Sequence, residues 1–207
     1  MSKDVYMGAG ILPTTVHDGR IWFLFGKENK YADTPGFSDI GGGTDNNETL
    51  LETAIREGTE ELTGFLGSEQ ELGDMLRRGT YNIDFKTTSK NGGVYRMHLF
   101  PYEYDPMLPV YYNNNANFID KKLDPKIIQT SKIFEKSEIR WICIDDLLKM
   151  RSQFRSYFQP HLDVIISQKS DIERFIKGKM RGLTNSSSRS SRPRSRRSRR
   201  SSRSTRR

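Results

Sequence analysis

The sequence predicts an α+β fold, because the period-2 alternation of strands and the 3.6-residue periodicity of helices both occur along it. Residues 81–86 alternate apolar and polar side chains, which is typical of a half-buried strand. Residues 50–62 instead place their apolar side chains on one arc of about 140° of a helix. The 207 residues are enough for one domain with a substantial core and a tail.

The individual elements follow from apolar patterns and from turn signals. Apolar segments at 7–12 and 21–26 are predicted to be two strands joined by a hairpin at Asp18-Gly19. Ser68 and Glu71 form a capping-box pattern that opens a helix to about residue 78. Further elements are expected at 81–86 and 94–104 (a second hairpin), 107–122 (a partly helical insertion), 139–144 (a buried strand), 145–148 (a short helix) and 154–179 (one or two amphipathic helices).

Three glutamates lie on one side of the helix predicted at 50–62. Glu57, Glu60 and Glu61 are spaced i, i+3 and i+4, so their carboxylates share an arc of about 100°. Like charges in this arrangement repel one another unless a cation lies among them. Oxygen ligands on one rigid element suit a hard divalent ion such as Mg²⁺ or Mn²⁺, which takes further ligands from substrate phosphates. The helix therefore indicates a site for phosphate chemistry.

The segment from Gly42 to Gly64 resembles the signature box of the Nudix hydrolase superfamily. That box consists of glycine, five residues, glutamate, seven residues, Arg-Glu, an aliphatic residue, any residue, Glu-Glu, any residue, glycine and an aliphatic residue. The matching positions here are Gly42, Glu48, Arg56, Glu57, Glu60 and Glu61. The chain departs from the box at Gly58, which replaces the aliphatic residue, and at Gly64, which comes one residue late. Gly58 is expected to cost the helix up to about 1 kcal/mol relative to alanine.

The resemblance implies a Nudix fold, which is an α/β/α sandwich with a mixed β-sheet between helices and a loop-helix-loop metal site. It also implies a Mg²⁺-dependent hydrolase, with Mn²⁺ as an alternative ion, that cleaves the diphosphate linkage of a nucleoside diphosphate linked to a group X. The implied metal ligands are Glu57, Glu60, Glu61 and the carbonyl of Gly41. Glu48 and Arg56 are expected to pair as a structural brace between the loop and the helix.

An acidic residue outside the box is also expected, because many Nudix enzymes place one in a loop that faces the metals. Glu135 and Glu138 precede the strand predicted at 139–144, and we favour Glu135 as general base or ligand. Glu103 is a weaker candidate, and a purely solvated role for these charges stays open. The expected catalytic residues are therefore Glu57, Glu60 and Glu135.

The C-terminal segment has a different composition from the rest of the chain. Residues 186–207 contain ten arginines and ten serines, which cannot bury a core. Without these arginines, 24 Lys and Arg face 26 Asp and Glu, a net charge of −2 for residues 1–185. We therefore predict a Nudix hydrolase domain at 1–180 and a disordered basic tail at 181–207.

The tail resembles the arginine-serine segments of RNA-processing and chromatin-associated proteins. Its arginines can neutralise phosphates and bind nucleic acid without regard to sequence. The residues expected to do so are Arg189, Arg192, Arg194, Arg196, Arg197, Arg199 and Arg200. Nuclear import, attachment to an anionic surface and simple solubilisation remain open alternatives.

The sequence leaves the identity of X open. We favour an mRNA cap, because a tail that binds RNA raises the local concentration of such a substrate. A dinucleoside polyphosphate or a nucleotide sugar is the main alternative, and inositol pyrophosphates would need a basic cluster that the domain does not offer. A catalytically silent Nudix fold that binds RNA or a protein is the alternative from another class.

Composition limits the remaining classes. No run of 18 apolar residues and no signal-peptide pattern occurs, so we expect a protein of the cytoplasm or nucleus that is neither secreted nor bound to a membrane. The single cysteine, Cys143, excludes an intrachain disulfide and is expected to pack in the core. His17, His98 and His161 are scattered and are expected to be structural. The oligomeric state is not indicated.

Overall fold

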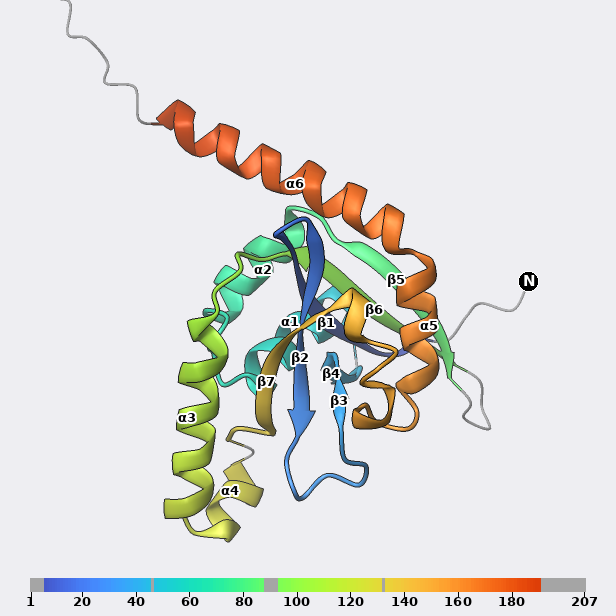
Figure 1. Cartoon of the computed structure of the whole chain (residues 1–207). Coiled ribbons are helices and arrows are strands. Elements are labelled where there is room, and N and C mark those ends of the chain that lie inside the picture. The colour runs from blue at the N-terminus through green and yellow to red at the C-terminus, as the bar shows by residue number, and fades with distance from the viewer. Residues whose placement is uncertain (1–5, 46, 88–92, 132, 191–207) are drawn as a thin grey trace, which may run out of the picture.

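The centre of the computed structural model, which describes residues 6–45, 47–87, 93–131 and 133–190, is a mixed seven-stranded sheet (Figure 1). The main strand order is β3-β2-β1-β6-β5, with β4 added to β1 and β7 added to β2. Among the described strands, β1 and β6 pair in parallel, and the other neighbouring strands pair antiparallel. The strands are β1 (Tyr6–His17), β2 (Arg20–Glu28), β3 (Phe37–Ser38), β4 (Ile40–Gly43), β5 (Tyr81–Thr87), β6 (Gly93–Pro101) and β7 (Lys136–Cys143).

Both predicted hairpins are present. Strands β1 and β2 meet at a two-residue turn in which Asp18 has a φ of +48° and Gly19 a φ of +71°. Positive φ at both central positions gives a type I′ turn, whose twist matches that of the flanking strands. The second hairpin pairs β5 with β6, and β6 ends at Pro101 rather than at the predicted residue 104.

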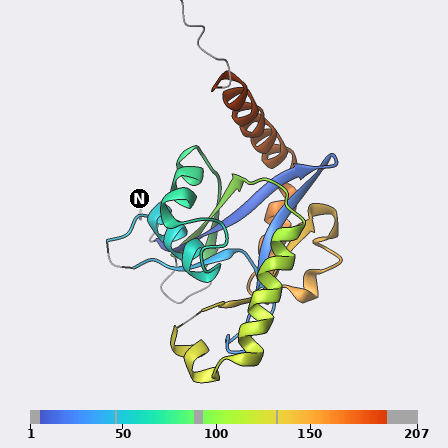
Figure 2. The same ribbon diagram turned by 90° about the vertical axis from the view of Figure 1, so that its left-hand side faces the viewer.

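Helices cover both faces of the sheet. They are α1 (Leu50–Glu61), α2 (Glu69–Arg77), α3 (Met107–Lys122), α4 (Pro125–Ser131), α5 (Gln159–Ser167) and α6 (Lys169–Ser190), with 3₁₀ turns η1 (Ile144–Asp146) and η2 (Arg151–Gln153). Neighbouring residues of β1 point to opposite cores: Ile11 packs with side chains of α1, α2 and α3, and Leu12 with those of α5 and α6. The predicted α/β/α sandwich is confirmed. Figure 2 shows the side along which α3 runs.

The predicted insertion at 107–122 is a complete helix, α3, rather than a partly helical segment. Only Tyr112 and Ala116 of α3 are buried, which explains why its apolar residues show no clear period. The Asn113 side chain donates to the Ile139 carbonyl at 3.1 Å and accepts from the Ile139 N–H at 2.8 Å. The side-chain amide of Asn113 therefore attaches α3 to strand β7 by hydrogen bonds, whereas a typical amphipathic helix packs on a sheet through an apolar stripe.

Helix α6 continues to Ser190, ten residues past the predicted domain end at 180. Arg189 lies in this helix, outside the side chains that the structure describes, and the other expected nucleic-acid contacts, from Arg192 to Arg200, fall beyond the described residues. The division into a domain and a basic tail stays a prediction. No helix in the described part of the chain is both long and apolar enough to cross a bilayer.

Candidate active site

Helix α1 carries the three glutamates and begins at a complete capping box. The N–H of Glu52 donates to Thr49 Oγ1, and the carboxylate of Glu52 accepts from the Thr49 N–H at 2.8 Å. At the other end, Thr63 and Gly64 both have positive φ, at +52° and +74°. The residue inserted before Gly64 therefore occupies the left-handed position that terminates a helix.

Arg56 connects the helix to the loop that precedes it. Its Nε lies 2.7 Å from Glu48 Oε1, and its Nη2 lies 3.1 Å from Glu48 Oε2, a two-point contact that fixes both side chains. Nη2 also donates to the carbonyl of Gly43 at 3.0 Å. The hydrogen bond from Arg56 holds the pKa of Glu48 at about 2. The structure thus brings the two expected brace residues together and adds the end of β4 to them.

The same guanidinium also contacts two of the glutamates expected to bind metal. Nη1 of Arg56 lies 2.9 Å from Glu57 Oε1 and 3.3 Å from Glu60 Oε2. Glu60 is 59% exposed, whereas Glu57 lies against β4, where a Cβ added to Gly42 would come within 2.6 Å of Glu57 Oε1. A side chain at position 42 would therefore push this carboxylate from its present position. Burial raises the pKa of Glu57, and the charges of Glu60 and Glu135 add to the rise.

Glu61 has a different environment from the other two glutamates. Its Oε1 lies 2.9 Å from Nζ of Lys136, and its Oε2 accepts a hydrogen bond from the N–H of Gly41 at 2.8 Å. Lys136 is only 1% exposed and also contacts Glu28 Oε1 at 2.5 Å. Burial alone would lower the pKa of Lys136, but the two carboxylates outweigh it and raise that pKa. An ammonium ion is therefore held between two carboxylates below the surface of the site.

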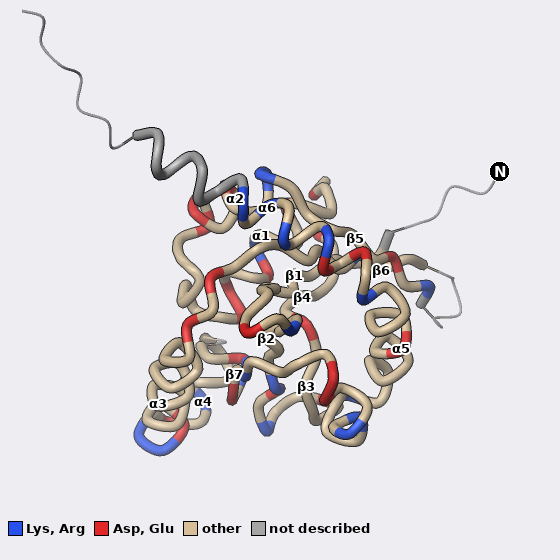
Figure 3. The backbone as a smooth tube through the Cα atoms, turned by 45° about the horizontal axis from the view of Figure 1, so that its top comes forward, with Lys and Arg blue, Asp and Glu red and all other residues tan. Residues whose placement is uncertain are grey.

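Arg155 completes this buried group of charges. Its guanidinium pairs with Glu28 Oε1 and donates to Thr34 Oγ1 at 2.9 Å. The two cations Lys136 and Arg155 thus balance the two carboxylates Glu28 and Glu61. Acidic and basic segments lie close together where α1, β2 and β7 meet (Figure 3). The sequence analysis did not predict that Glu28, Lys136 and Arg155 belong to the site.

A β-bulge accounts for the inward position of Lys136. In the pairing of β2 with β7, Lys27 lies opposite Glu138, but Glu28 lies opposite Lys136, so Ser137 is the extra residue. Without the bulge, alternation would place the Lys136 side chain on the same side of β7 as Glu138, away from Glu28 and Glu61. The hydroxyl of Ser137 donates to the carbonyl of Glu28 at 2.9 Å and anchors the bulge.

The three acidic candidates outside the box lie in different places. Glu135 precedes β7, lines a hollow together with Glu28, and is close enough for its charge to raise the pKa of Glu57. Glu138 faces the opposite side of β7, where it pairs with Lys27 and Arg140. Glu103 is exposed after the end of β6. The structure therefore brings Glu135, but not Glu138, toward the box glutamates.

The donor set fits a hard divalent ion in chemical type. Arg56 uses one oxygen each of Glu57 and Glu60, so that within the described part of the chain Glu57 Oε2 and Glu60 Oε1 are left for a cation. Mg²⁺ commonly binds through one or two carboxylates, water and substrate phosphates. Within the described residues, however, no group of three or more His, Cys, Asp or Glu side chains converges on one point. Arg56 and Lys136 supply the positive charge that three closely spaced carboxylates need.

A cavity of about 850 Å³ adjoins the glycine strand β4. Its walls include the backbone of Gly41 to Gly43, the rings of Tyr95 and Tyr157, and His161, which is stacked on Phe85. Asp39 also lines the cavity and accepts a hydrogen bond from the Tyr95 hydroxyl at 2.8 Å. Burial raises the pKa of Asp39 to about 6. The volume and aromatic lining suit a small organic ligand such as a nucleoside.

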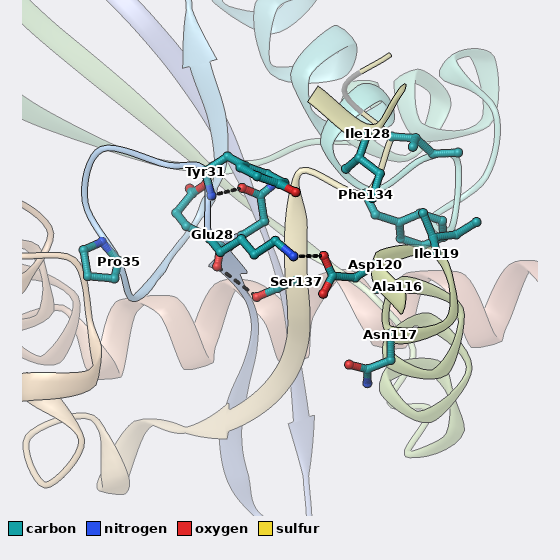
Figure 4. A pocket seen from close by; sticks show the side chains of 13 residues that line it. Glu28, Tyr31, Pro35, Ala116, Asn117, Ile119, Asp120, Ile128, Phe134 and Ser137 are labelled. Atoms are coloured by element: carbon teal, nitrogen blue, oxygen red, sulfur yellow. Dashed lines mark hydrogen bonds and ion pairs between the residues drawn. The ribbon is translucent and has the colours of Figure 1, made fainter. Parts of the chain in front are cut away.

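A smaller hollow of about 300 Å³ lies on the other side of the molecule, between the loop after β2 and helices α3 and α4 (Figure 4). Lys30 and Asp120 face each other across it at 2.6 Å. Tyr31 and Phe134 supply aromatic surface to its lining.

No protein-family model and no curated protein matches the sequence. Among solved structures, the chain is similar to a C. elegans Ap4A hydrolase in a binary complex, with 16% identity, a TM-score of 0.48, and coverage of 84% of this chain and 99% of that chain. It is also similar to the M. smegmatis Nudix hydrolase RenU, with 12% identity, a TM-score of 0.47, and coverage of 81% and 91%.

A third similar structure is a bifunctional NMN adenylyltransferase/ADP ribose pyrophosphatase from Francisella tularensis, complexed with AMP and a Mn ion. The identity is 15% and the TM-score 0.49, over 81% of this chain and 42% of that chain. At such identities and TM-scores these likenesses do not decide the family of the chain. Its function has to be inferred from its own residues.

Proposed function

We propose that this chain is a Mg²⁺-dependent hydrolase of the Nudix type, which cleaves the diphosphate linkage of a nucleoside diphosphate linked to X. The observation that carries the proposal is the position of strand β4. Glu57 of the box helix lies against Gly42 of this strand, and the same strand borders the aromatic cavity of about 850 Å³. A nucleoside in the cavity would place its diphosphate beside the carboxylates.

The expected ligands differ in how they could bind Mg²⁺. Glu57 and Glu60 would hold Mg²⁺ through the oxygens that Arg56 leaves open. Glu61 and the carbonyl of Gly41, the other expected ligands, are joined to each other by the hydrogen bond from the Gly41 N–H. Mg²⁺ bound there would supply Lewis-acid polarisation of the phosphoryl group. The chain itself would orient the diphosphate and accept a proton from the attacking water.

The proton acceptor would be Glu57 or Glu135. Burial and neighbouring charges raise the pKa of Glu57, but Mg²⁺ bound to this carboxylate would lower that pKa, so we favour Glu135 as the acceptor. Glu135 contributes to that rise through its own charge. Arg56, which contacts Glu48, Glu57 and Glu60, would keep the carboxylates in register through the reaction.

For the group X, we propose an mRNA cap, with free dinucleotides or nucleotide sugars as the alternative. The support for the cap comes from the sequence: ten arginines between residues 186 and 207 can bind the phosphates of an attached RNA. The proposed RNA contacts are those expected above, from Arg189 to Arg200.

A comparison of substrates tests both the proposed hydrolase activity and the proposed identity of X. The full chain, Glu60→Gln and the exposed control Glu69→Gln would be incubated with Mg²⁺ and either cap-labelled RNA or free dinucleotides. We expect Glu60→Gln, but not Glu69→Gln, to lose hydrolysis. Absence of hydrolysis by every form, or full activity of Glu60→Gln, would contradict the enzyme proposal and favour a silent binding module.

A tail variant separates the two kinds of X. Replacing the arginines between residues 192 and 207 by glutamine keeps the chain length and leaves α6 as it is. If the substrate is capped RNA, decapping should weaken in this variant at physiological salt, and the effect should shrink at high salt. Cleavage of free dinucleotides only, indifferent to the arginines, would instead identify a small-nucleotide hydrolase.

A further inference from the structure

We propose that Lys136 is a built-in cation that keeps Glu61 out of the metal shell, so that the chain binds its divalent ion through Glu57 and Glu60. This inference rests on the proposed function, because it concerns the metal that this function requires. It assigns to Lys136 a positioning role, and to Glu61 a role different from that of the other two box glutamates.

The first argument is the occupancy of the carboxylate oxygens. Both oxygens of Glu61 are engaged, Oε1 by the Lys136 ammonium at 2.9 Å and Oε2 by the Gly41 N–H at 2.8 Å. Glu57 and Glu60 each use one oxygen for Arg56 and keep the other. The three carboxylates share a face of α1, but, among the contacts of the described residues, only Glu57 and Glu60 can take a new cation without giving up a partner.

The second argument is that the position of Lys136 is built by the fold. Its side chain lies across Gly26 of β2, where an added Cβ would come within 2.9 Å of Lys136 Cγ. The bulge at Ser137 turns the residue inward. The hydroxyl of Tyr112 donates to the Lys136 carbonyl at 2.9 Å and to the Glu61 carbonyl at 3.3 Å. Strand, bulge and helix α3 thus fix the ammonium beside Glu61.

The third argument concerns charge. Lys136 and Arg155 match Glu28 and Glu61 in number, so these four side chains leave no excess negative charge to attract a divalent ion. Recruitment of Glu61 by a metal would leave the ammonium of Lys136 with one carboxylate fewer, and the loss of a partner from a buried ion pair is costly. Glu61 instead links α1 to β4 through Gly41, which holds the glycine strand in place for Glu57.

Titration with Mn²⁺ tests the proposal without reference to catalysis. Bound Mn²⁺ would be counted by the loss of the free-ion EPR signal in the full chain and in Glu60→Gln, Glu61→Gln and the control Glu69→Gln. We expect Glu60→Gln to lose at least about tenfold in affinity, a loss typical of disturbed metal sites. Glu61→Gln should stay within about twofold of the unaltered chain, like the control.

An equal loss in Glu60→Gln and Glu61→Gln would overturn this inference and leave the proposed function standing. An unaltered chain that binds no Mn²⁺ would contradict the proposed function, and this inference with it. If circular dichroism shows that Glu61→Gln does not fold, the paired variant Glu61→Gln with Lys136→Met removes both charges together. The Mn²⁺ affinity of this paired variant should also stay within about twofold of that of the unaltered chain.

Lys136→Met tests the positioning residue directly. Removal of the ammonium leaves Glu61 Oε1 without its cation, while Glu28 stays paired with Arg155. We expect this variant to bind one Mn²⁺ more than the unaltered chain, whereas the exposed control Lys149→Met should not. An unchanged count in Lys136→Met would show that Lys136 does not exclude metal from Glu61, and would overturn the role given to it.

Discussion

Gly58 of helix α1 lies so close to Ile11 of strand β1 that a Cβ at position 58 would come within 2.5 Å of Ile11 Cδ1. Leu72 of α2 closes the other side of this contact, at 3.0 Å from the same point. The Nudix box has an aliphatic residue at this position. In this chain, the ends of the Ile11 and Leu72 side chains occupy the space that such a residue would need and would have to shift to admit it.

Replacement of this glycine by the aliphatic residue of the box should therefore destabilise the fold. Because overpacking of a core typically costs about 1–3 kcal/mol, we expect Gly58→Leu to lower the free energy of unfolding by that amount. Urea unfolding of Gly58→Leu, Ile11→Ala and the double variant measures the coupling. The double variant should be more stable than the sum of the single losses predicts, and simple additivity would refute direct contact as the cause.

The brace between Arg56 and Glu48 should be visible in a titration. Because the hydrogen bond from Arg56 is the main cause of the low pKa of Glu48, Arg56→Gln should raise that pKa from about 2 toward the ordinary value of about 4.3. Carboxyl ¹³C NMR against pH would follow the change. Glu71, whose pKa is lowered by its own capping box at Ser68, is the internal control and should not move.

His98 should make the fold sensitive to acid. It is 4% exposed, and burial lowers its pKa to about 4 from an ordinary value of about 6.5, with the charge of Arg96 adding to the shift. A depressed pKa means that the unfolded chain takes up the proton first, so this contribution to stability is complete above about pH 6.5 and is lost as the pH falls toward 4.

The loss attributable to His98 should reach about 3 kcal/mol at pH 4, since each pKa unit corresponds to about 1.36 kcal/mol. The free energy of unfolding would be measured at pH 7 and pH 4 for the unaltered chain and for His98→Gln. The acid-induced loss in the unaltered chain minus that in His98→Gln gives the part due to His98. The half-exposed His17→Gln serves as control. A His98→Gln chain that loses as much stability in acid as the unaltered chain would exclude His98 as the cause.

Tyr157 should contribute to binding of the substrate base. It lines the large cavity and is 51% exposed, with the guanidinium of Arg155 4.8 Å from the centre of its ring. Loss of a stacking partner costs about 1–3 kcal/mol per base, so Tyr157→Ala should raise KM about tenfold or more with little change in kcat. Tyr111→Ala removes a similarly exposed ring from α3, away from the cavity, and should leave KM unchanged. Equal effects of the two substitutions would exclude stacking on Tyr157.

Local signals in the sequence were sufficient for much of the fold. The Asp18-Gly19 turn and the alternation at 81–86 correctly predicted hairpins, because the backbone conformation at these positions depends on neighbouring residues alone. The spacing of Glu57, Glu60 and Glu61 likewise follows from helix geometry. What spacing could not show is that each of these carboxylates already has a cationic partner within the chain.

Lys136 could not be predicted from alternation, because the bulge at Ser137 reverses which side of β7 faces inward. The only signal was a lysine beside a serine at the start of an apolar strand, and that pattern usually marks a solvated strand end. The amide-rich helix α3 was underestimated for a related reason. Its attachment depends on hydrogen bonds from Asn113 to a strand that is distant in sequence, which no local periodicity records.

The two hydrogen bonds between Asn113 and Ile139 affect whether strands of other copies of this chain can add to the sheet. Strand β7 pairs with β2 along one side, and on its other side the amide of Asn113 satisfies both backbone groups of Ile139, as a neighbouring strand would. An exposed strand edge is a template for adding strands from other chains. With α3 in place, the backbone groups of Ile139 are already bonded and cannot pair with an added strand. A strand from another copy could pair with β7 at this point only after α3 has detached.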